Sequence, residues 1–185
     1  MSTKYCSSSS VSTINSEQAI TSRKTSYELS PEITYTNILL HILNKNQKLP
    51  DYNEKIEQSI DGHFKRNKKQ SISLLDYLKR ILKYIEVENN TLILSLIYID
   101  RICKEKVFLN EFNIHRIMFI SIIMAYLYNE DETEEEEDLA MVGGISLKEM
   151  IILEHDFIDL IDFNFYVDEK IFEEYKNKFL SQSDK

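Results

Sequence analysis

Four histidines and one dense run of carboxylates are the residues of this chain whose chemistry could support catalysis or metal binding. The histidines (His41, His63, His115 and His155) fall in separate segments, and none has a paired cysteine or histidine at zinc-site spacing. Neither a G-x-S-x-G nucleophile elbow nor an HExxH zinc motif is present. We therefore expect no catalytic site, no metal, no cofactor and no small-molecule substrate.

The carboxylate run extends from Glu130 to Asp138. It lacks the turn residue and the alternating ligands of a calcium loop, so we interpret it as a solvated, flexible loop. A docking segment for a basic partner is the alternative. The formal net charge is −9, and this run holds nearly all of it, so the remainder shows no basic face for nucleic acid. The short basic run at 65–69 is likewise interpreted as a solvated loop.

The two cysteines indicate a reducing compartment. Cys6 lies in a Ser-rich segment and Cys103 in an apolar one, so no disulfide framework is predicted and Cys103 is expected to be a buried thiol. No apolar run approaches the roughly 20 residues of a membrane span, and no signal-peptide core is expected. The first 30 residues permit a transit peptide but lack its Arg-rich amphipathic pattern. We expect a cytoplasmic or nuclear protein without a membrane partner.

The N-terminal 29 residues are rich in Ser and Thr and predict a disordered tail. Ser30-Pro31 is interpreted as a helix N-cap followed by proline at the first helical position; a proline-directed phosphosite is the alternative. A polar connector, 44–70, follows this first helix. The helix is supported by a stripe of apolar residues at helical spacing: Ile33, Ile38, Leu39, Ile42 and Leu43.

Long apolar stretches at helical spacing then dominate the chain. They are too long for typical strands, and no Gly or Pro occurs between Asp76 and Asp138, so the fold class is predicted to be all-α. The second stretch is apolar nearly all round and is expected at the centre of a bundle. The expected helices run from Leu74 to Ile85, from Leu92 to Ile102, from Ile114 to Tyr128, from Leu147 to Ile161 and from Asp168 to Leu180.

Several polar residues mark where these helices begin. Ser71 or Ser73 caps the first of them, and Asn110 or Asn113 caps the third. A further helix starts after Gly143-Gly144, where Ser146 and Glu149 have the spacing of a capping box. The two glycines are interpreted as a turn and not as a phosphate cradle. In the middle of that helix Glu154 stands among apolar residues, and its charge needs a partner that this chain need not supply.

Four segments resemble the helices of the cyclin box, and most closely those of the P-type (U-type) cyclins: SISLLDYLKRILKY, TLILSLIYIDRICK, LNEFNIHRIMFISIIMAYL and VGGISLKEMIILEHDFIDLIDFNFYV. The motif YIDR and the motif VGGIS followed by LE carry most of the specificity. The resemblance implies one five-helix cyclin box over 64–180, preceded by an N-terminal helix and connector over 30–63 and by the tail at 1–29. Asp100-Arg101 within YIDR are interpreted as structural contacts, with a binding site as the alternative.

By this resemblance the chain is not an enzyme but a regulatory subunit that binds and activates a cyclin-dependent kinase, in the cell cycle or a nutrient response. A cyclin-fold interaction adaptor that does not activate a kinase is the alternative. In the family the third and fifth box helices press on the kinase's regulatory helix, and a Lys–Glu pair anchors it. The kinase-binding residues that the resemblance implies are Glu154, Tyr126, Leu127, His155, Ile158, Phe163 and Phe165.

Three departures from the family pattern stand out. Tyr126 occupies the position of the family's lysine, so one half of the anchoring pair is missing. The carboxylate run replaces the family's aromatic and asparagine residues, which leaves the short helix between the third and fifth box helices without sequence support. The family's substrate-docking patch on the first box helix is not visible, and 70–72 stands near its place.

Overall fold

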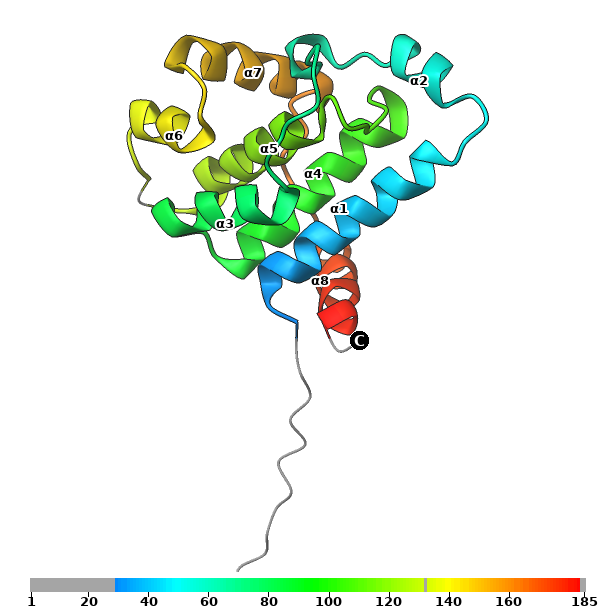
Figure 1. Cartoon of the computed structure of the whole chain (residues 1–185). Helices are drawn as coiled ribbons and strands as arrows, with labels where there is room; N and C mark the ends of the chain where they lie inside the picture. Colours follow the sequence, from blue (N-terminus) through cyan, green and yellow to red (C-terminus); the bar gives the residue numbers. More distant parts are fainter. Residues whose placement is uncertain (1–28, 132, 184–185) are drawn as a thin grey trace, which may run out of the picture.

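The computed structural model describes residues 29–131 and 133–183, and within these ranges it is entirely helical (Figure 1). The all-α prediction is therefore confirmed. The predicted tail, apart from residue 29, lies outside the described residues, as does Cys6. The elements are α1 (Pro31–Gln47), α2 (Tyr52–Gln58), the 3₁₀ turn η1 (Gly62–Phe64), α3 (Leu74–Tyr84), α4 (Asn89–Glu105), α5 (Ile114–Asn129), α6 (Glu136–Gly143), α7 (Leu147–Leu160) and α8 (Glu169–Ser183).

Helix α4 lies at the centre, because its apolar residues point in every direction. All residues from Thr91 to Ile99 are buried, and α5 and α8 pack directly on the helix (Figure 1). The polar groups in this stretch are satisfied inside the protein. Tyr35 of α1 and Ser95 share a buried hydrogen bond of 2.9 Å, and Ser95 also donates to the Leu92 carbonyl. The predicted central position is confirmed.

Asp100 and Arg101 attach the last part of the chain to α4. Asp100 accepts a hydrogen bond from the Tyr175 hydroxyl of α8. Arg101 donates to the backbone carbonyls of Asn164 and Tyr166, in the segment between α7 and α8. Both residues therefore make the structural contacts that the sequence interpretation assigned to them.

Two of the predicted caps form as expected. Ser73 accepts a hydrogen bond from the Asp76 amide, and Ser146 accepts one from the Glu149 amide at 3.2 Å. The capping box is only half formed, because the Glu149 carboxylate binds Arg116 of α5. Ser30 stands at the N-cap position of α1, yet its hydroxyl makes no capping hydrogen bond.

The polar connector contains helical structure that was not predicted. Helix α2 and turn η1 each bury one apolar side chain, Ile56 and Phe64, and the Phe64 ring packs edge-on against Phe157 of α7 at 6.3 Å. Each element is so short that a single buried residue anchors it, which leaves no periodic pattern to detect.

The carboxylate run is not simply a loop. Its last residues, Glu136, Glu137 and Asp138, form the first turn of α6, where carboxylates are stabilised by the positive end of the helix dipole. The helix then buries Leu139, and it ends at Gly144 with φ of +71°. The short helix between the third and fifth box helices is therefore present.

Within the ranges that the structure describes, we searched for a membrane span, a metal site and a reactive thiol. No helix there is long and apolar enough to cross a membrane, and no group of three or more His, Cys, Asp or Glu residues could hold a metal ion. Cys103 is a free thiol on α4, and burial raises its pKa to about 12. At that pKa it is protonated and unreactive at neutral pH.

Replacing Gly143 with alanine is expected to destabilise the protein by about 1–3 kcal/mol, because the added Cβ would overlap the buried ring of Phe119. Helix propensity alone predicts the opposite sign, since alanine is favoured over glycine by about 1 kcal/mol. Urea denaturation measures the difference, with the exposed substitution Lys79→Ala as control. A more stable Gly143→Ala variant would show that the α6–α5 contact is loose.

Candidate functional site

Helix α7 has one face in the core and one face directed outward. Its inner face consists of residues at helical spacing: Met150, Leu153, Phe157 and Leu160. The adjoining face, which we call the α7 outer face, consists of Ile151, Glu154, His155 and Ile158. Ile151 is 38% exposed, His155 is exposed, and the other two are half-buried. The outer face thus combines apolar side chains with a single carboxylate.

Glu154 is the polar group in this site that the fold leaves incomplete. Its Oε1 is buried and has no hydrogen-bond partner within the described residues. Burial raises the pKa of the Glu154 carboxyl, and the nearby Glu136 of α6 raises it further, whereas His155 opposes the shift. An unpaired buried acceptor typically costs about 1–3 kcal/mol, so a donor supplied by another molecule is worth more here than at an ordinary surface position.

At the end of α5, Tyr126 turns inward and the next two residues turn outward. Tyr126 is only 3% exposed, and its hydroxyl donates to Glu134. Burial, with Glu134 second, raises the pKa of Tyr126 to about 12. Leu127 and Tyr128 are 39% and 54% exposed. Tyr126, which stands where the resemblance implies a lysine, therefore links the carboxylate run to α5 through its hydrogen bond to Glu134.

The segment after α7 separates its two phenylalanines. Phe163 adopts a left-handed conformation with φ of +58° and is 74% exposed. Phe165 is half-buried: its ring lies edge-on to Tyr98 of α4 at 5.5 Å and stacks on Tyr128 of α5 at 6.3 Å. Phe165 thus supports the site from inside, whereas Phe163 is available to a partner.

These contacts place the end of α5 beside the segment that follows α7. The Tyr128–Phe165 stack joins the end of α5 to the segment after α7, and helices α5 and α7 pack on each other. Sequence reasoning missed Tyr128 and Ile151, although Ile151 lies three residues before Glu154 and so on the same helix face. We define the α5–α7 surface by Leu127, Tyr128, Ile151, Glu154, His155, Ile158 and Phe163.

Replacing Glu154 with glutamine is expected to stabilise the isolated chain at about pH 7.5, by about 1 kcal/mol or less because the site is half-exposed. A raised folded-state pKa means that stability falls as pH rises from the unfolded pKa through the folded one. The difference should therefore shrink toward about pH 4, near the unfolded pKa. Urea denaturation at the two pH values tests this, with the exposed Glu57→Gln on α2 as control. If Glu154→Gln is less stable than the wild type at both pH values, the interpretation of Glu154 as an unpaired carboxylate is wrong.

Comparison with known proteins gives the chain a family. A family model described as Cyclin matches residues 4–165. The chain is 35% identical over 132 residues to Cyclin-U4-3 of Arabidopsis thaliana, covering 70% of this chain and 60% of that protein. It is 34% identical over 134 residues to Cyclin-P3-1 of Oryza sativa subsp. japonica, covering 72% and 56%. The PHO85 cyclin-like protein psl1 of Schizosaccharomyces pombe is 38% identical over 114 residues, covering 60% and 47%.

The chain therefore spans about half to three fifths of the length of these relatives. The match to the family model covers most of the chain, from the N-terminal region through α7. It includes every residue of the α5–α7 surface. Together with the all-helical fold, this identifies the chain as a member of the cyclin family, of the P-type (U-type) group.

Proposed function

We propose that this cyclin is the regulatory subunit of a cyclin-dependent protein kinase, which it binds through the α5–α7 surface and activates. The observation that carries the proposal is the buried Oε1 of Glu154, which has no hydrogen-bond partner among the described residues and lies on the same helix face as the exposed Ile151 and the half-buried Ile158. Family membership supports it, and one relative is named PHO85 cyclin-like protein psl1.

Two kinds of residue contribute to the proposed interface. Leu127, Ile151 and Phe163 are exposed apolar side chains whose burial against the kinase supplies most of the binding free energy. Glu154 supplies orientation, because a donor from the kinase must meet its half-buried carboxylate. Truncating one partner of such a buried charged hydrogen bond typically costs about 2–5 kcal/mol of binding free energy.

Activation follows from which kinase conformation the surface fits. In protein kinases an ion pair between a strand lysine and a glutamate of the regulatory helix must form before phosphoryl transfer. A cyclin that binds only the inward position of that helix shifts the kinase toward the active state. The size of the shift equals the difference in its affinity for the two states.

A second candidate is an adaptor that binds a kinase, or another helical partner, without activating it. Tyr126 favours this alternative, because it supplies no cation at the position of the family's lysine and its hydroxyl is engaged with Glu134. Loss of one charge-assisted hydrogen bond weakens binding to the regulatory helix of the kinase, whereas the apolar contacts remain.

Glu154→Gln is expected to weaken binding to the cognate cyclin-dependent kinase at least about tenfold, while leaving the free chain folded and no less stable. Purified kinases from the same organism, titrated with the cyclin in a calorimeter, give the affinity. The matched control Glu57→Gln removes the same charge on α2 and should bind like wild type. Equal affinity of wild type and Glu154→Gln for every kinase that binds would count against this interface.

Activation is expected to appear as a rise in kinase activity that saturates at the dissociation constant measured by calorimetry. A phosphorylation assay with a generic peptide substrate tests it, and Ile158→Asp should abolish both binding and the rise because it places a second charge beside Glu154. Binding without any rise in activity would instead favour the adaptor.

A further inference from the structure

A small cavity of about 190 Å³ lies at the other end of α5, away from the α5–α7 surface. Its walls come from α3, the first turn of α5, the loop before α3 and the turn between α6 and α7. The side chains that matter here are Arg66, Arg80 and Arg116, with Gln70 and His115 between them. No Asp or Glu of the described residues lines it.

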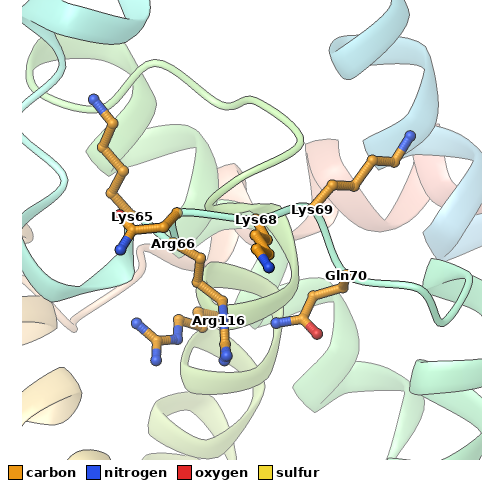
Figure 2. Close-up of a pocket in the computed structure, with 7 residues that line it drawn as sticks. Lys65, Arg66, Lys68, Lys69, Gln70 and Arg116 are labelled. Atoms are coloured by element: carbon orange, nitrogen blue, oxygen red, sulfur yellow. The ribbon is translucent and has the colours of Figure 1, made fainter.

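A second, wider hollow of about 430 Å³ adjoins the cavity and shares Arg66, Gln70 and Arg116 with it. Its other lining residues include Lys65, Lys68 and Lys69. Figure 2 shows the Arg66 and Arg116 side chains together beneath the loop, with Gln70 beside them and the Lys69 amine extending away. The basic run at 65–69, interpreted from sequence as a solvated loop, thus forms one wall of a positively charged depression.

Each arginine is held in place by hydrogen bonds. Arg116 binds the Glu149 carboxylate and the His63 carbonyl. Arg80 donates to the Met141 carbonyl at 3.0 Å, at the end of α6. The guanidiniums therefore need little further ordering to receive a ligand.

Arg66 is held in a similar way, with Gln70 as its partner. With the Gln70 amide oriented to satisfy both groups, Arg66 donates to its oxygen from Nε and Nη1 at 2.9 and 3.1 Å. Within the described residues only Arg116 of the three arginines is paired with a carboxylate. The cavity thus keeps an excess of positive charge.

Two buried polar atoms in the wall lack partners. His115 is 8% exposed, and its Nε2 donates to the Ile72 carbonyl at 2.9 Å, so its Nδ1 is an open acceptor. Burial lowers the pKa of His115, which keeps the ring neutral at pH 7. The Nε of Arg116 is also buried without a partner within the described residues. Neither atom has accessible surface, so the groups that a ligand in the cavity can reach are the guanidiniums that line it.

The local field is unfavourable to the positive charge of Arg116. His115 and Arg116 occupy the first turn of α5, at the positive end of the helix dipole, and that turn has no acidic residue. Burial, followed by the charge of Arg66, lowers the pKa of Arg116. Cations placed against a helix N-terminus and against each other are relieved by an anion bound between them.

We propose that this cavity binds a phosphoryl group, carried either by inorganic phosphate or by a phosphorylated Ser or Thr of a polypeptide. Guanidiniums match phosphate oxygens in bidentate geometry, and Arg66, Arg80 and Arg116 supply three of them around one small space. A polyanion is disfavoured, because the chain as a whole has a net charge of −9.

The site is distant from the Leu127 end of the proposed kinase surface, although Arg116 binds Glu149 of α7, two residues before Ile151. Arg116 and Leu127 lie on the same helix, and eleven residues of α-helix separate them by about 16 Å. Binding at one end of α5 can therefore be measured without the other, and the kinase proposal stands or falls independently.

The test titrates the full chain with four probes at fixed low ionic strength and follows amide shifts by NMR. The probes are sodium phosphate, sodium sulfate, N-acetyl-phosphoserine N-methylamide and its serine counterpart. We expect saturable shifts at Arg116 and Gly144 with at least one phosphate probe and none with serine. The double variant Arg66→Gln/Lys68→Gln should weaken that binding about tenfold or more. The control Lys79→Gln/Lys83→Gln removes two charges from α3 outside both hollows and should stay within about twofold of wild type.

The phosphate probes distinguish the two sources. Phosphoserine binding about tenfold tighter than inorganic phosphate assigns the site to a phosphorylated polypeptide, whereas equal or tighter binding of inorganic phosphate assigns it to the free ion. The proposal is overturned if neither phosphate probe saturates, if sulfate binds as tightly as both, or if the two double variants lose affinity equally. Arg116 is left unchanged because its substitution would also break the Glu149 ion pair.

Discussion

All residues of helix α4 from Thr91 to Ile99 are buried. The other helices must therefore cover this helix on every side, and this requirement determines where they lie. Helices α5 and α8 pack against it, and α1 reaches it through the Tyr35–Ser95 hydrogen bond. Helix α7 packs on α5 and so lies one layer further out. Only one of its faces is needed for the core, which leaves the α7 outer face for a partner.

The α7 outer face and the end of α5 differ in how their polar groups are satisfied. Glu154 has a buried Oε1 without a partner among the described residues, which is expected to cost the free chain stability, and the proposed kinase contact would supply the missing donor. Tyr126, at the position where the resemblance implies a lysine, instead makes an internal hydrogen bond to Glu134. The interface on α5 therefore depends on the shape of its apolar residues more than on charge.

The sequence correctly predicted the elements that have a repeating apolar pattern or a serine cap. The apolar periodicity of α4 and α5 and the caps Ser73 and Ser146 predicted elements that the structure contains. It was insufficient for α2 and η1, which have one buried residue each, and for α6, whose carboxylates resemble a loop until the helix dipole is considered. The arginine cavity joins residues from distant segments, so neither charge counting nor local spacing could reveal it.

Helix α5 contributes to both surfaces at its ends, while every residue from Ile117 to Ile123 is buried between them. The packed middle separates Arg116 from Leu127 by about 16 Å along the helix, so the energetic effects of substitutions at these two positions should add. A substitution at one end of α5 is therefore expected to alter one of the two proposed recognition surfaces and to leave the other intact. A substitution in the buried centre of the helix would instead affect both through the stability of the fold.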